Sequence, residues 1–105
     1  MTAPTMNRPS APSEEPLPSV FAVRAELEPF ADIRHFDRQV DAAIQSAAAT
    51  GSFGQLREVL LTQLGFALMA KHADTHVRLP MEQRGVNRDR MVAQWLAEHA
   101  AEAAR

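Results

Sequence analysis

Residues 56–69 read LREVLLTQLGFALM, and the rest of the chain is organised around this stretch. At helical spacing, most of its apolar side chains, and Ala73 just beyond it, fall into two rows on different sides of one helix. The rows are Leu56, Leu60, Leu64 and Ala67, and Val59, Phe66, Met69 and Ala73. An ordinary surface helix carries one apolar stripe roughly 100° wide. Two rows therefore predict a central helix that neighbours cover on several sides.

The length of the chain fits one domain, and the absence of cysteine excludes disulfides and thiolate metal sites. Residues 1–18 hold five of the seven prolines together with Ser, Thr and Glu, a composition typical of a disordered tail. Residues 19–105 then form the folded domain. A domain of this size buries only about 60–65% of its unfolded surface. We therefore expect homodimerisation to complete it.

The charge balance and the hydropathy pattern restrict the partners and the location. The net charge of −2 argues against a protein that holds nucleic acid by bulk charge. The first 19 residues lack the apolar core of a signal peptide. The central stretch is interrupted by Arg57, Glu58 and Gln63, and a membrane span needs about 20 apolar residues. The sequence therefore predicts a cytoplasmic protein without a membrane span.

Residues 20–28 alternate between apolar and polar side chains as a strand does, yet their composition favours a helix. Ser19 could cap such a helix, and Pro29 sets its end because the residue before a proline avoids helical geometry. A strand here would be nearly alone in the chain and would need a partner strand from a second copy. We predict the helix.

The next helix is predicted to begin at Pro29, a residue that suits the first helical position. Its apolar stripe consists of Phe30, Ile33, Phe36, Val40, Ala43, Ile44 and Ala47. Gly51 suits the C-terminal cap of this helix. The central helix is then expected over residues 53–76, with Ser52 as its N-cap and Gly65 as a point where another helix comes close.

Pro80 and Gly85 predict a connector over residues 79–86. Asn87 would cap the last helix, over about residues 88–104, with Val86 and Met91 as a hydrophobic staple. Trp95, the one tryptophan, would anchor this helix to the central one. The sequence as a whole predicts an all-α fold, a small bundle of three to four helices behind the disordered Pro-rich tail.

His72 and His76 lie four residues apart, a spacing at which two imidazoles can share a metal ion. A metalloprotease helix would carry Glu after the first histidine, but Ala73 stands there. The two histidines are therefore weak candidates, better interpreted as a solvated helix end. No nucleophile elbow, phosphate loop or dinucleotide fingerprint is present. We predict no metal, no cofactor and no enzymatic activity.

Four arginines cluster within residues 78–90, around the predicted connector. This layout offers an alternative function, a small DNA-binding regulator in which Arg84, Arg88 and Arg90 contact DNA. Asp89 in the same segment weakens that interpretation. A solvated arginine-rich corner is favoured, and a nucleic-acid partner is not expected.

Apolar helix surface that a small bundle leaves uncovered marks an interface. A homodimer is the favoured use of this surface, followed by a different partner protein on the same or an adjacent face. The residues predicted at a partner or dimer interface are Phe30, Ile33, Phe36, Val40, Ile44, Leu60, Leu64 and Phe66.

Residues 53–69, FGQLREVLLTQLGFALM, and the last helix with Trp95 also carry a resemblance. In length, helix order and composition, residues 19–105 resemble the small helical anti-activators of LuxR-type quorum-sensing regulators. The resemblance implies a dimeric protein that binds the ligand-binding domain of a transcription activator. Such a protein would disrupt the activator's own dimer and so block DNA binding. The resemblance rests on no diagnostic motif and assigns no functional residue.

Overall fold

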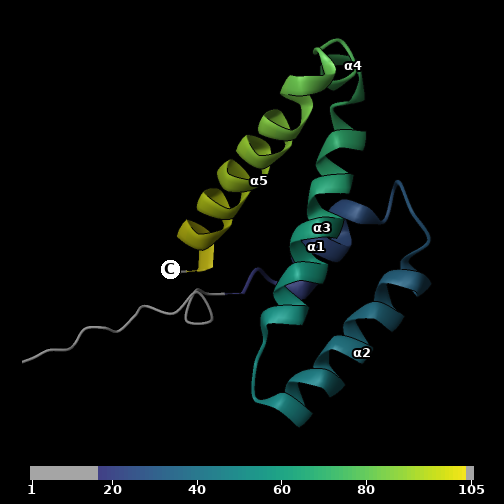
Figure 1. Ribbon diagram of the computed structural model, residues 1–105, viewed down its shortest axis with the longest axis vertical. Helices are drawn as coiled ribbons and strands as arrows, with labels where there is room; N and C mark the ends of the chain where they lie inside the picture. The colour runs from purple at the N-terminus through teal and green to yellow at the C-terminus, as the bar shows by residue number, and fades with distance from the viewer. Residues whose placement is uncertain (1–16, 104–105) are drawn as a thin grey trace, which may run out of the picture.

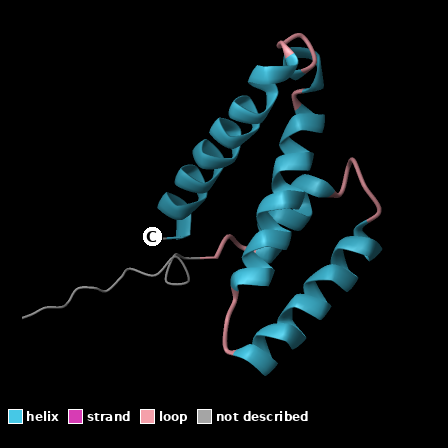
Figure 2. Cartoon of the chain, viewed as in Figure 1, coloured by secondary structure: helices cyan, strands magenta, loops and turns pink. Residues whose placement is uncertain are grey.

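The computed structural model describes residues 17–103, with side chains through residue 100. The tail predicted for residues 1–18 lies outside this range except for its last two residues, and Leu17 already packs against the core. Within the described range the chain forms helices and no strand (Figures 1 and 2). The helices are α1 (Val20–Leu27), α2 (Ile33–Thr50), α3 (Gly54–Lys71), α4 (Ala73–His76) and α5 (Met81–Ala103). The all-α prediction is confirmed.

Helix α3 is the centre of the bundle, as its two apolar rows predict. It contacts α1, α2 and α5, and Figure 1 shows it between α2 on one side and α5 on the other. Its buried residues are Leu56, Leu60, Leu64, Gly65, Ala67 and Leu68. The other helices complete the core with Val23, Leu27, Phe36, Val40, Ala43 and Trp95.

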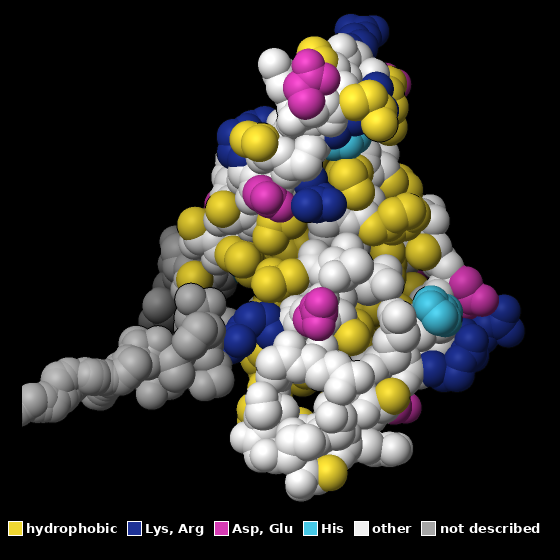
Figure 3. Space-filling view, viewed as in Figure 1, with side chains coloured by type: hydrophobic (Ala, Val, Ile, Leu, Met, Phe, Trp, Pro, Cys, Tyr) yellow, Lys and Arg dark blue, Asp and Glu magenta, His cyan; other side chains and the backbone are white. Residues whose placement is uncertain are grey.

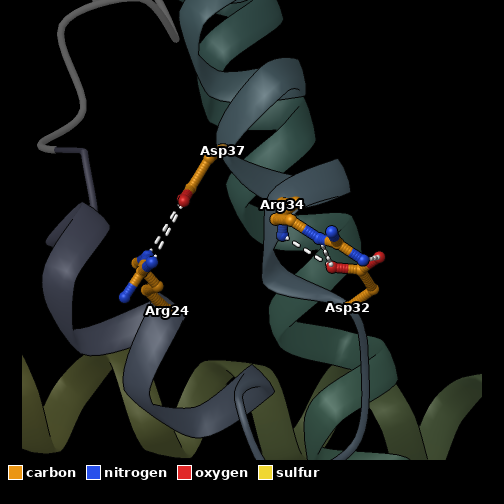
Figure 4. A network of polar contacts seen from close by, with 4 residues as sticks. All are labelled: Arg24, Asp32, Arg34 and Asp37. Carbon is orange, nitrogen blue, oxygen red and sulfur yellow. Dashed lines mark hydrogen bonds and ion pairs between the residues drawn. The ribbon is translucent and has the colours of Figure 1, made fainter.

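Helix α1 confirms the helical interpretation of residues 20–28. The Ser19 Oγ accepts a hydrogen bond from the Ala22 backbone N–H at 3.2 Å, which is the predicted N-cap. A bidentate ion pair then ties α1 to α2, because Arg24 Nε and Nη2 donate to Asp37 Oδ1 and Oδ2 at 2.9 and 3.0 Å (Figure 4). The hydrogen bond from Arg24 lowers the pKa of the Asp37 carboxyl, and Asp37 raises the pKa of Arg24.

Helix α2 begins at Ile33, so the prediction that Pro29 opens it is wrong. Residues 28–31 form a turn, and Asp32 is the N-cap, with Oδ1 accepting from the Arg34 backbone N–H at 2.9 Å. The Asp32 carboxylate satisfies a free N–H of the first helical turn and so fixes the start of α2 at Ile33, after the turn that contains Pro29. The end of α2 is as predicted, since Gly51 adopts a left-handed φ of 77°.

The central helix is shorter than predicted. It ends at Lys71, and His72 separates α3 from the single turn of α4, so residues 53–76 are not one helix. Ser52 is not the N-cap, because Phe53 occupies that position without a side-chain hydrogen bond. The Ser52 Oγ instead accepts from the Gly54 backbone N–H at 3.1 Å, within the turn that leads into α3.

Helix α5 begins at Met81, directly after Pro80, so the predicted connector over residues 79–86 is wrong. Asn87 lies inside the helix and caps nothing, and Val86 is 71% exposed and forms no staple with Met91. The start of α5 is supported by Arg84, whose guanidinium donates to Leu79 O at 3.0 Å and to Val77 O at 2.8 Å. These bonds satisfy carbonyls left free where α4 ends.

Gly65 marks the close approach of α3 and α5, as its position in mid-helix predicts. A Cβ at Gly65 would lie 3.2 Å from Arg88 Cδ and 3.8 Å from Val92 Cγ2. The missing side chain therefore lets the aliphatic part of Arg88 lie directly on α3. Across residues 17–103, no helix is both long enough and apolar enough to cross a membrane.

Candidate functional site

An open groove of about 640 Å³ runs between α3 and α5. Its apolar lining consists of Leu61, Phe66 and Met69 from α3 and Val92, Ala93 and Leu96 from α5. We call this feature the apolar groove. The two helices are close together near α4 and diverge along α5 (Figure 1), and hydrophobic side chains gather on the surface over both of them (Figure 3).

Phe66 is the most exposed of the large apolar side chains that line the groove. It retains 45% of its surface in the middle of a helix whose neighbouring residues Gly65 and Ala67 are buried. It belongs to the second apolar row of the central helix, and α5 covers that row only in part. A half-exposed aromatic ring in an apolar depression is the kind of group that anchors protein interfaces.

The rim of the apolar groove carries both signs of charge. Arg88 Nη2 and Asp89 Oδ1 lie 3.3 Å apart, and both side chains are exposed. An exposed pair of this kind contributes little to the stability of the fold. Arg88 and Asp89 are therefore free to exchange this contact for charged groups of a partner.

Helix α5 is tied to the rest of the bundle by a polar cluster on its other face. Trp95 Nε1 donates to Glu26 Oε2 of α1 at 3.0 Å, and Lys71 Nζ of α3 lies 3.4 Å from Glu26 Oε1. Burial by itself raises the pKa of the Glu26 carboxyl. The hydrogen bond from Trp95 and the charge and hydrogen bond of Lys71 together lower this pKa by more than burial raises it, so the net shift is downward. The His99 ring stacks on Trp95 with the ring centres 3.6 Å apart.

The structure separates the predicted interface residues into two groups. Four of them lie in the core of the single chain, where no partner can reach them without unfolding; they are Phe36, Val40, Leu60 and Leu64. Phe30 and Ile44 are exposed and Ile33 is half-buried, but they lie on the α2 side of the molecule. Phe66 alone of the predicted set lines the apolar groove.

The sequence prediction missed Leu61, Met69, Val92 and Leu96 as members of one surface. The available signal was the second apolar row of the central helix, which contains Met69 and Phe66. Spacing within one helix shows which residues share a side but does not show which side the neighbouring helix covers. The side of α3 that α5 covers determines where the groove lies.

The two candidate metal ligands do not form a metal site in the described part of the chain. His72 is exposed at the break between α3 and α4, whereas His76 is buried and its Nδ1 lies 3.1 Å from Asn87 Nδ2. No three His, Asp or Glu side chains among the described residues are arranged to hold a metal ion. The contact with Asn87 gives His76 a structural role, joining α4 to α5.

Each arginine proposed for DNA contact has a polar contact within the protein. Both donor groups of Arg84 described above bind backbone carbonyls, and Arg88 pairs with Asp89. Arg90 donates to the Asn87 side chain. Since α5 begins at Met81, these residues lie in the first half of one continuous helix and not at the start of a separate reading helix.

In comparisons with known proteins, no family matches this chain, and no similar curated protein or solved structure was found. The function is therefore argued from the apolar groove and its surroundings.

Proposed function

We propose that this protein is a non-enzymatic interaction protein that sequesters a transcription activator by binding one of its helices in the apolar groove. The observation that carries the proposal is the half-exposed Phe66 at the centre of an open apolar groove of about 640 Å³. The resemblance to anti-activators supplies the class of partner, a LuxR-type regulator. Such a regulator acts in the cytoplasm, where the proposal also places this protein.

The walls of the groove favour a helix as the bound element. Both walls are helices, and the described residues contain no strand whose backbone could pair with an extended peptide. A helix satisfies its own backbone hydrogen bonds and so needs no strand partner in the groove. Val92 and Leu96 are spaced by four residues on α5, which suits contact with an apolar helix face. Arg88 and Asp89 provide a polar rim for charged residues beside that face.

The proposal includes a homodimer, which uses a different surface. Ile33 and Ile44 lie about three turns apart on one side of α2, and Ile44 is 47% exposed. Helix α2 lies on the opposite side of α3 from α5 (Figure 1), so a dimer there leaves the apolar groove open. Light scattering on the full chain should give about twice the chain mass of 11.6 kDa. The mass of a single chain at micromolar concentration would remove the dimer from the proposal.

The proposal is tested by affinity capture of the tagged full chain from its native cells, followed by mass spectrometry. The wild-type protein should retain a LuxR-type regulator in near-stoichiometric amount. A Phe66→Ala variant should bind it at least about 30-fold more weakly, because loss of an anchoring aromatic costs about 2 kcal/mol or more. Alanine is a better helix former than phenylalanine, so α3 is expected to persist.

Phe21→Ala is the matched control. Phe21 is 84% exposed on α1 and does not line the apolar groove, so this change removes the same exposed ring from another surface. It should leave binding of the regulator unchanged. Recovery of the protein alone, or equal retention of a regulator by the wild type and Phe66→Ala, would overturn the proposal.

A further inference from the structure

A second cleft lies on the other face of α5 and shares no lining residue with the apolar groove. It has a volume of about 450 Å³, within the range of roughly 300–1,000 Å³ that is usual for small-molecule sites. Its apolar lining comes from three segments of the chain: Leu68 of α3, Leu79 of the turn before α5, and Met91 and Trp95 of α5. We call it the Trp95 cleft.

Charged side chains surround this apolar lining. Lys71 comes from the end of α3 and Arg90 from α5, whereas Glu98, further along α5, is the one acid among the lining residues. Lys71 is already paired with the Glu26 carboxylate at 3.4 Å, which leaves Arg90 as the lining cation without an ion-pair partner among the described residues. A ligand with a single negative charge would supply that partner.

Each cation is held by a contact within the protein that a ligand carboxylate would replace. Lys71 Nζ lies 3.4 Å from Glu26 Oε1, a long contact made by a half-exposed side chain. The other oxygen of Glu26 accepts the Trp95 hydrogen bond and does not depend on Lys71. Arg90 donates to the uncharged side chain of Asn87, and no described carboxylate forms an ion pair with it.

We propose that the Trp95 cleft binds a small monocarboxylate with an apolar body. The apolar body would lie against Leu68, Met91 and the edge of Trp95, and the carboxylate would accept hydrogen bonds from Lys71 and Arg90. Charge-assisted hydrogen bonds of this kind are roughly twice as strong as neutral ones. Burial of the apolar body supplies affinity, and the two cations supply selectivity for the acid.

Trp95 reports on this site directly because it is the only tryptophan of the chain. Octanoate, which does not fluoresce, is titrated into the full-length protein at neutral pH while tryptophan emission is recorded. A saturable change is expected. Octanamide, which has the same apolar body without the charge, should bind at least about tenfold more weakly, as should octanoate to a Lys71→Ala/Arg90→Ala variant. The absence of a saturable change, or equal affinities for octanoate and octanamide, would overturn the proposal.

Four variants locate the site. Arg90→Ala alone should weaken octanoate binding, and Arg90→Lys, which keeps the positive charge, should bind octanoate better than Arg90→Ala. If Arg90 had only a structural role, the positive charge of lysine would not restore binding. Arg78→Ala is the matched control, because Arg78 is exposed nearby and does not line the cleft. Phe66→Ala should also leave octanoate binding unchanged. A loss with Phe66→Ala as large as that with Arg90→Ala would place the ligand in the apolar groove and overturn the assignment.

Discussion

The two sides of α3 differ in how completely they are covered. On one side, α2 buries Phe36, Val40, Ala43 and Ala47, and the bidentate Arg24–Asp37 ion pair links it to α1. On the other side, Trp95 is the one buried residue of α5 within residues 81–100. Openings lie on both faces of that helix.

The two sides of α3 therefore differ in role: the α2 side contributes mainly to stability, and the α5 side offers the surfaces proposed for binding. The small side chains of Ala43 and Ala47 suit close packing of α2 in the core, and the buried area there supplies hydrophobic stabilisation. Helix α5 instead packs three only partly buried side chains, Met91, Val92 and Leu96, against the core. It also lays the stem of Arg88 over Gly65 and is fixed to α1 through Trp95. Surfaces that bind partners are commonly drawn from such less densely packed regions.

The largest effect is expected on the α2 side. Phe36→Ala should lower the free energy of unfolding by about 3–5 kcal/mol, because the ring is fully buried and its removal leaves a cavity. Urea denaturation followed by circular dichroism measures the change. Ile44→Ala on the exposed side of the same helix should shift it by no more than about 0.5 kcal/mol at concentrations where the protein is monomeric. Equal losses for the two variants would contradict the comparison.

A smaller effect is expected where α5 meets α3. Gly65→Leu should cost about 1–3 kcal/mol, because even a Cβ would lie 3.2 Å from Arg88 Cδ and a longer side chain must displace α5. The measurement is again urea denaturation, with Trp95 fluorescence as a second signal for the position of α5. Gly85→Leu is the control, since nothing lies within 4 Å of a Cβ at Gly85. A Gly65→Leu protein as stable as the wild type would show that the close approach is dispensable.

The Glu26 cluster predicts how pH affects the attachment of α5. Because the pKa of Glu26 is lowered in the folded protein, its contribution is fully present above the unfolded value of about 4.3 and is lost as pH falls through the folded pKa. Glu26→Gln should therefore cost about 1 kcal/mol at pH 7, and the difference from the wild type should shrink in acid. Urea denaturation at a series of pH values measures this difference.

Glu58→Gln serves as the control for that pH series, because Glu58 is exposed on α3. The lowered pKa values of Asp32 and Asp37 act in every variant and cancel in the comparison. A difference between the wild type and Glu26→Gln that stays constant from pH 7 to pH 3 would exclude the proposed contribution of the carboxylate.

The smallest expected effect is a gain in stability, at Gly85 in α5. Gly85→Ala should stabilise the protein by about 0.5–1 kcal/mol, because glycine inside a helix has a high entropic cost and the added methyl group meets nothing within 4 Å. A rise in the thermal midpoint measures the gain. A loss of stability would mean that the chain around Gly85 is not regular helix.

Local signals in the sequence predicted several boundaries correctly. Ser19 caps α1, Gly51 ends α2 in a left-handed conformation, and Gly65 lies where α5 comes close. The two caps depend on the geometry of a few consecutive residues, whereas Gly65 only marks a place where a neighbour can come close. The prediction for Pro29 was wrong because Asp32, three residues later, offered a better cap.

The start of α5 could not be predicted in the same way. Gly85 and Val86 are unfavourable in a helix, and Asn87 is a good cap, so local preference favoured a connector. In the folded chain, Arg84 binds two carbonyls of the preceding turn and Asn87 contacts the buried His76. These contacts with the α4 region override the weak local preferences.

The sequence by itself determined the helical class, the central position of α3 and the presence of two apolar rows on it, because these follow from periodicity within one segment. Only the tertiary structure decided which row lies in the core and which faces a groove. It also brought Glu26 to Trp95 across 69 residues of the chain. The position of α5 depends on contacts between residues far apart in the sequence, and hydrophobic spacing along one helix carries no information about which distant helix will cover it.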